Sequence, residues 1–119
     1  MLSRGGLLEI VWENEKVEIR INEAILDETN AEAMRQEMAA ILDRLAGMHV
    51  IFDLRFVEFL TSSSLGIFLT ILKRLRGVGG TLTLCNASPE VYEIFTTTRL
   101  NDLLNVRKLL CSDRLRSEI

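Results

Sequence analysis

The apolar run HVIFDL at residues 49–54 constrains the fold more than any other stretch of this chain. It has the length of a strand and is apolar almost throughout, which is typical of a central strand covered on both faces. Two earlier segments, LLEIVWE at 7–13 and KVEIRIN at 16–22, predict strands joined by a short polar turn. Apolar and polar residues alternate in the second segment, so one of its faces should be covered and the other exposed to water.

Helical patterns separate these strands from the ones that follow. Apolar residues recur at helical spacing after Thr29, which with Glu32 predicts a capping box, and Gly47 should end this helix. A second helix is expected at about 63–76, followed by a strand over TLTLCN, a short helix, and a last strand or helical turn. The order ββαβαβα, then a short strand or helix, predicts an α/β domain with a mixed, mostly parallel sheet and helices packed on it.

Composition narrows the classes of protein to consider. The 119 residues suit one domain, and 48% of them are hydrophobic, so an ordinary core can form. The net charge of -3, with scattered basic residues, argues against nucleic acid as a partner. No stretch approaches the roughly 20 apolar residues of a membrane span, and the start lacks a signal peptide, so we expect a cytoplasmic protein with no membrane partner. Cys85 and Cys111 are expected to be reduced there.

Four hydroxyl residues, Thr61–Ser64, lie between an apolar run and the most apolar helix of the chain. A helix start needs one capping hydroxyl, so the others require a separate explanation. A nucleophilic serine needs a base, and the only histidine, His49, lies at the far end of the preceding strand. We therefore expect no catalytic residue. Metal-ligand spacing is lacking, and the glycines at 77–80 precede a strand rather than a helix, so no metal or cofactor is expected.

Two explanations of these hydroxyls remain open from the residues alone. They can be a cap with solvated neighbours, or one of them can accept a phosphate. A serine at a helix N-terminus lies beside free backbone N–H groups and the positive end of the helix dipole, where a phosphate is tolerated.

The helix after the hydroxyls adds a candidate contact. At 100° per residue its core stripe consists of Leu65, Phe68, Leu69, Leu72 and Leu75. Ile67 falls nearly opposite this stripe and is expected to be exposed, one turn after the serines. An exposed apolar side chain beside a switchable hydroxyl indicates a docking surface.

The order of motifs along the chain resembles that of the anti-sigma factor antagonists, which are STAS domains. An apolar strand ending in Asp53 is followed by VEFLTSSSLG, an apolar helix, GG, a strand, SPEV and RLNDLL. The family pattern in the same order is V-x-F-x-D-S-S-G-L-G, GG, SP-x-V and GL-x-x-L. AILDETNAEAMRQEM, earlier in the chain, is similar to the family's GELD segment and the helix after it. The likeness runs from about residue 7 to 110, so residues 1–119 are expected to form a single STAS domain.

This resemblance implies a binding module rather than an enzyme. Its partner would be an anti-sigma factor, a serine kinase of the histidine-kinase-like ATPase type, with a serine phosphatase that resets the switch. The unphosphorylated antagonist would sequester this kinase and free a sigma factor for transcription. Alignment on LG at 65–66 makes Ser63 the phosphoacceptor and Asp27 part of the partner-facing surface. The other residues implied to bind the partner are Ser62, Ser64, Leu65, Gly66 and Ile67.

The chain departs from the family pattern at three positions. Thr61 replaces the usual Asp, Ser64 replaces a Gly, and Ala24 replaces the first Gly of the GELD segment. These departures keep two alternatives open. The chain can be a STAS scaffold or a regulatory domain derived from a sensor or transporter. It can also be a STAS domain that binds a small molecule or nucleotide without a phosphorylation switch.

Overall fold

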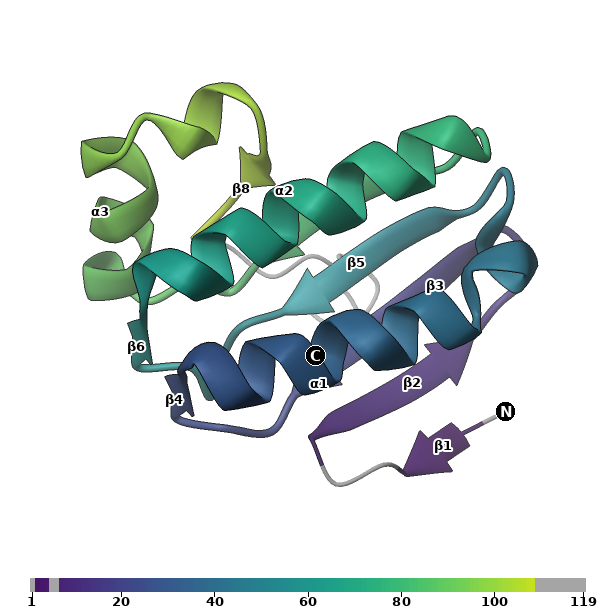
Figure 1. Ribbon diagram of the computed structural model, residues 1–119, viewed down its shortest axis with the longest axis horizontal. Coiled ribbons are helices and arrows are strands. Elements are labelled where there is room, and N and C mark those ends of the chain that lie inside the picture. The colour runs from purple at the N-terminus through teal and green to yellow at the C-terminus, as the bar shows by residue number, and fades with distance from the viewer. Residues whose placement is uncertain (1, 5–6, 109–119) are drawn as a thin grey trace, which may run out of the picture.

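The computed structural model describes residues 2–4 and 7–108, whose longest strands form one sheet with helices on one face (Figure 1). The strands are β1 Leu2–Arg4, β2 Leu8–Trp12, β3 Lys16–Ile21, β4 Ile25–Leu26, β5 His49–Asp53, β6 Phe59–Leu60, β7 Thr81–Cys85 and β8 Asn105–Val106. The α-helices are α1 Glu28–Ala40, α2 Ser62–Gly77 and α3 Pro89–Thr97, and the 3-10 helices are η1 Leu42–Leu45 and η2 Leu100–Asp102.

Six strands form the main sheet in the order β1-β2-β3-β5-β7-β8. The first three pair antiparallel, and β3, β5, β7 and β8 pair parallel to one another. Helical crossovers join the parallel strands, as the alternation of strand and helix patterns predicts. The predicted α/β class, the mixed and mostly parallel sheet, and the central place of 49–54 are confirmed.

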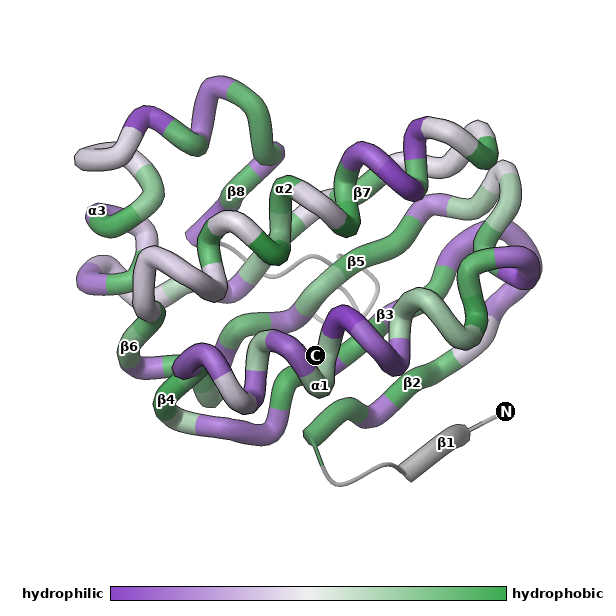
Figure 2. The backbone as a smooth tube through the Cα atoms, viewed as in Figure 1, coloured by the Kyte–Doolittle hydropathy of each residue, from purple (hydrophilic) through white to green (hydrophobic). Residues whose placement is uncertain are grey.

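The core lies between the sheet and the two long helices, α1 and α2. Val50 and Phe52 of β5 are fully buried, and Figure 2 shows hydrophobic residues running along this strand. The Phe52 ring meets Phe68 of α2 edge to face, with 5.7 Å between centroids, and Phe68 lies 6.2 Å from Phe95 of α3. Such aromatic pairs contribute about 0.5–1.5 kcal/mol beyond the area they bury. They hold α2 and α3 in place on the sheet.

The start of α1 differs from the prediction. The N-cap is Asp27, whose carboxylate accepts from the backbone N–H of Asn30 at 2.9 Å, so Thr29 lies inside the helix. Glu32 binds Arg35 instead of closing a capping box, with 3.0 Å between its Oε1 and the arginine Nε. The prediction of Thr29 as the N-cap is therefore wrong. The Asp27 carboxylate, two residues earlier, already accepts from a backbone N–H group that the first turn of α1 leaves unpaired.

The cysteines also differ from the prediction. Cys85, at the end of β7, is 1% exposed and disulfide-bonded rather than reduced. Cys111 lies outside the described residues, and so does the end of the last predicted strand, of which β8 is the described part. In residues 2–4 and 7–108, no helix has the length and apolarity that crossing a membrane requires.

Candidate partner-binding surface

Two short parallel strands, β4 and β6, bring the starts of α1 and α2 together. Ile25 pairs with Phe59 and Leu26 pairs with Leu60 in a separate two-stranded sheet at the carboxyl end of the central strands (Figure 1). The Ala24 carbonyl accepts from the backbone N–H groups of Glu58 and Phe59, which fixes this pairing. Residues 34 positions apart in the sequence, such as Ile25 and Phe59, are thereby placed side by side.

The two helix starts repeat one local pattern. Each consists of an exposed apolar residue, a buried leucine and an N-cap: ILD at 25–27 and FLT at 59–61. At the second start, the Thr61 hydroxyl accepts from the backbone N–H of Ser64 at 3.3 Å. The Thr61 backbone N–H donates to the Leu26 carbonyl at 3.2 Å, so this cap also ties α2 to β4. Thr61 therefore performs the capping that an aspartate can perform.

Of the three serines, only two are available to another molecule. Ser62 and Ser63 are exposed, and within the described part of the chain neither hydroxyl bonds to protein. Both stand in the first turn of α2, where unpaired backbone N–H groups and the helix dipole favour an anion. A phosphate on either hydroxyl would project into solvent.

Ser64 and Leu65 belong to the core, which corrects their assignment to the partner-binding surface. Ser64 is fully buried, and its hydroxyl donates to the Thr61 carbonyl at 2.6 Å, while Leu65 is 6% exposed. Helical periodicity explains this placement, because these residues share a face with Phe68, which contacts β5. The hydroxyl that replaces the family's glycine is thus an internally satisfied group.

Ile67 also differs from its prediction, since it is half-buried and packs against the core. Ile71, one turn further along α2, lines a groove shared with Met38 of α1. Helical periodicity places Ile67 away from the face of α2 that meets the sheet, but α1 packs alongside α2 and widens its buried face. Gly66 is exposed, and a Cβ built on it would meet nothing within 4 Å.

Two exposed apolar residues in the short strands before the helix starts were not predicted from the sequence. Ile25 and Phe59 are 54% and 53% exposed, and their pairing places them as neighbours across β4 and β6. Asp27, also exposed, follows Ile25 by two residues. The repeated ILD and FLT pattern was the available signal, since each opens with an apolar residue on a two-residue strand. We call Ile25, Asp27, Phe59, Ser62, Ser63 and Gly66 the carboxyl-end surface.

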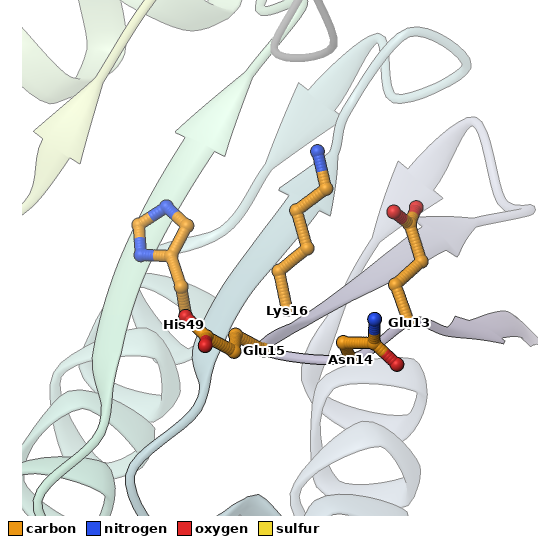
Figure 3. A pocket seen from close by; sticks show the side chains of 5 residues that line it. All are labelled: Glu13, Asn14, Glu15, Lys16 and His49. Carbon is orange, nitrogen blue, oxygen red and sulfur yellow. The ribbon is translucent and has the colours of Figure 1, made fainter.

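An open depression lies at the opposite, amino end of the parallel strands. Figure 3 shows its lining by Glu13, Asn14, Glu15, Lys16 and His49. The His49 ring is half-buried and hydrogen-bonds the hydroxyls of Thr81 and Thr83, the latter at 3.3 Å. Burial lowers the pKa of His49, and the charges of Lys16 and Arg107 lower it further.

This histidine has no serine to activate. His49 begins β5, and Ser62 and Ser63 follow beyond the carboxyl end of the same strand (Figure 1). Among residues 2–4 and 7–108, no group of His, Cys, Asp and Glu is placed to hold a metal ion. The exposed groups at the carboxyl end are two apolar side chains, a capping carboxylate and two serine hydroxyls.

The chain matches a known family over most of its length. The STAS domain family matches residues 8–111. This chain is a STAS domain protein. It is 34% identical over 73 residues to BtrV of Bordetella bronchiseptica, a candidate anti-sigma factor antagonist. That match covers 61% of this chain and 62% of BtrV, so the chain spans less than two thirds of that relative.

Two further relatives of this STAS domain cover more of their length. The anti-sigma-B factor antagonist of Bacillus subtilis strain 168 is 28% identical over 97 residues, which are 81% of this chain and 86% of the relative. The structure of the anti-sigma factor antagonist SpoIIAA in its unphosphorylated form superposes with a TM-score of 0.70 at 25% identity. It covers 83% of this chain and 86% of SpoIIAA.

Proposed function

We propose that this STAS domain is an anti-sigma factor antagonist that sequesters an anti-sigma factor on its carboxyl-end surface. One observation carries the proposal: the exposed serines begin α2 a few residues after Phe59, which is itself exposed and pairs with the exposed Ile25. Paired apolar side chains more than half exposed lose area to water only when a partner covers them. The names of the relatives support an anti-sigma factor as this partner.

Phosphorylation of Ser63 ends the capture in this proposal. The acceptor would be modified by the sequestered anti-sigma factor acting as a serine kinase of the histidine-kinase-like ATPase type, and a serine phosphatase would restore it. A phosphate of about -2 charge is stabilised by the start of α2, so the fold tolerates it. The same charge between two docked surfaces meets desolvation and repulsion, so the complex does not tolerate it.

The roles of the surface residues follow from their positions. Ile25 and Phe59 supply apolar area, Asp27 supplies a charge at the start of α1, and Gly66 leaves room for the partner over the first turns of α2. The domain comprises residues 1–119, acts by binding rather than by catalysis, and needs no cofactor for this role.

The experiment has two steps. The chain, immobilised in its unphosphorylated form, captures its partner from an extract of its native cell, and mass spectrometry identifies that partner. The purified partner is then incubated with the chain and ATP, and the tryptic peptide 56–73, which contains every hydroxyl in question, is sequenced. Phosphate on Ser63 supports the proposal, and phosphate only on Thr61 or Ser62 would contradict the choice of acceptor.

Two variants of Ser63 distinguish release of the partner by a negative charge from loss of the folded structure. Ser63→Asp should retain a native circular dichroism spectrum and bind the partner at least tenfold more weakly, about 1.4 kcal/mol. Ser63→Ala should bind like the unmodified chain and take up no phosphate. A Ser63→Asp protein that binds with unchanged affinity would overturn the electrostatic release.

A further inference from the structure

The connection between β5 and β6, residues 54–58, leads from the central strand to the carboxyl-end surface (Figure 1). The strand β6 follows it directly, and the capped start of α2 comes next. Of the five side chains in this connection, only those of Leu54 and Val57 are buried. A segment with so few buried side chains opens locally unless polar contacts hold it. The position of β6 therefore depends on the polar contacts of this connection.

Asp53, the last residue of β5, is the centre of these contacts. Its side chain is 15% exposed. The Asp53 Oδ1 accepts from the backbone N–H of Arg55 at 3.0 Å, and Oδ2 accepts from the Arg55 Nε at 2.9 Å. Oδ1 also accepts from the Nδ2 of Asn86 at 2.9 Å. Hydrogen bonds to an ionised group are shorter and stronger than those between neutral groups, so this carboxylate is a firm anchor.

Asn86 brings in a second connection, the one between β7 and α3. Its backbone is left-handed, with φ of 59°, a conformation that asparagine adopts more readily than most residues. This turn places the Asn86 amide beside Asp53, from a segment 33 positions later in the sequence. The Leu54 backbone N–H donates to the Cys85 carbonyl at 2.9 Å, next to the same turn. Two hydrogen bonds, one from each connection, thus fasten the two connections to each other.

Arg20 contacts the same connection from the β3 side of β5. Its guanidinium carbon lies 5.7 Å from the centroid of the Phe56 ring, and its Nη1 donates to Glu9 at 3.3 Å. The side chains of Arg20 and Phe56 are both more than 40% exposed, and the separation is close to the limit of about 6 Å for a cation–π contact. This contact is weaker than the bonds to the Asp53 carboxylate, so Asp53 and Asn86 dominate the restraint.

We propose that Asp53 and Asn86 are positioning residues for partner binding. Their hydrogen bond holds residues 54–58 so that β6 stays paired with β4, and the exposed Ile25 and Phe59 are set in place before the partner arrives. A surface that is already ordered loses less conformational entropy on binding. The consequence for affinity rests on the proposed function, whereas the effect on β6 is a property of the free chain.

Amide hydrogen exchange in the full chain, without any partner, tests the positioning. The Glu58 and Phe59 backbone N–H groups donate to the Ala24 carbonyl at 2.6 and 3.1 Å, so their exchange reports the opening of β6 from β4. Asn86→Asp sets a second carboxylate against Asp53 at pH 7. Relative to the Phe52 amide in the same protein, it should speed the exchange of both N–H groups at least tenfold. An unchanged ratio would overturn the proposal.

Two further variants and one control complete the exchange experiment. Asn86→Gly keeps a residue suited to left-handed backbone and removes only the amide, so it should raise the same ratio at least threefold, even if Asn86→Asp does not fold. Asn105→Asp is the matched control, because the Asn105 side chain donates to the Thr83 hydroxyl at 3.2 Å, away from β6. It should change the ratio less than twofold, and a change equal to that of Asn86→Asp would overturn a specific role for Asn86.

A reversed pair separates positioning from a general loss of stability. Asp53→Asn combined with Asn86→Asp exchanges donor and acceptor and keeps the net charge, so the exchange ratio should return to within threefold of the unmodified chain. Titration calorimetry with the captured partner should show at least fivefold weaker binding for Asn86→Asp and recovery in the reversed pair. Faster exchange with unchanged affinity would overturn the role in binding. If the unmodified chain captures no partner, the proposed function fails, and the exchange data still decide the positioning of β6.

Discussion

The two ends of the parallel strands differ in how their polar groups are satisfied. At the amino end, His49 hydrogen-bonds Thr81 and Thr83, and Thr83 in turn accepts from the Asn105 side chain at 3.2 Å. At the carboxyl end, the hydroxyls of Ser62 and Ser63 have no protein partner among the described residues. The amino end also carries the open depression, which lacks exposed apolar side chains in its lining.

This difference shows that the size of a hollow is a poor guide to function in this domain. The His49 ring in the lining of the depression is already hydrogen-bonded to Thr81 and Thr83, so it has little left to offer a ligand. At the carboxyl end, the exposed apolar pair and the two hydroxyls that have no protein partner among the described residues are still available. The carboxyl-end surface is therefore where substitutions should affect binding and spare the fold, and the amino end is where they should affect the fold alone.

The largest expected effect comes from placing a charge in the apolar pair. Phe59→Lys and Ile25→Lys should each weaken capture of the anti-sigma factor at least tenfold, because full burial of such side chains contributes about 1.5–3 kcal/mol. Their free energies of unfolding should change by only about 0.5 kcal/mol, since both residues are exposed. Asn14→Lys adds the same charge at the amino end and is the matched control for titration calorimetry. Equal affinities for all three variants would place the interface elsewhere.

Ile67 tests whether the carboxyl-end surface extends further along α2. This residue lies one turn after Ser63 but packs on the core. Ile67→Lys should lower the free energy of unfolding by about 1–2 kcal/mol, through lost packing and a partly buried charge. Urea denaturation gives this value. Affinity for the partner, measured under conditions where the variant is folded, should stay within threefold. A variant with unchanged stability and much weaker binding would restore Ile67 to the interface.

Substitutions of Gly66 can distinguish an effect on partner binding from an effect on stability. Gly66→Ala should raise the free energy of unfolding by about 0.5–1 kcal/mol, because alanine is the better helix former and its Cβ meets no atom within 4 Å. Gly66→Leu should fold as well but weaken capture, since its side chain would stand in the partner's space. If Gly66→Leu binds normally, the first turns of α2 are not part of the interface.

The smallest expected effect is the contribution of His49 to the pH dependence of stability. Its lowered pKa means that the folded state binds protons less readily than the unfolded state, so protonation opposes folding. The contribution of neutral His49 to stability is fully present above its unfolded pKa of about 6.5 and is lost as the pH falls through the folded pKa. His49→Gln should therefore flatten the pH dependence of the melting temperature between about pH 7 and pH 5. Partner affinity should not change at neutral pH.

Elements dictated by local pattern were predictable from the sequence. The strands β3, β5 and β7 and the start of α2 lie within a residue or two of their predicted places, because alternation, apolar runs and caps act over a few neighbouring residues. Ser62 and Ser63 are exposed at a helix start, as their position next to the capping Thr61 requires. The start of α1 could not be predicted from local sequence, because Asp27 and Thr29 are both good N-cap residues. The pairing of Leu26 with Leu60 fixes the end of β4, and α1 begins directly after it.

Tertiary contacts decided the rest. No spacing in the sequence brings Ile25 to Phe59, because the pairing of β4 with β6 depends on how α1 and α2 both leave the same edge of the sheet. Ile67 is half-buried because it packs against a core that α1, α2 and the sheet form together. The sequence determined which elements form, through interactions between near neighbours. The packed structure alone decided which residues remain uncovered, since burial is a property of elements distant in the chain.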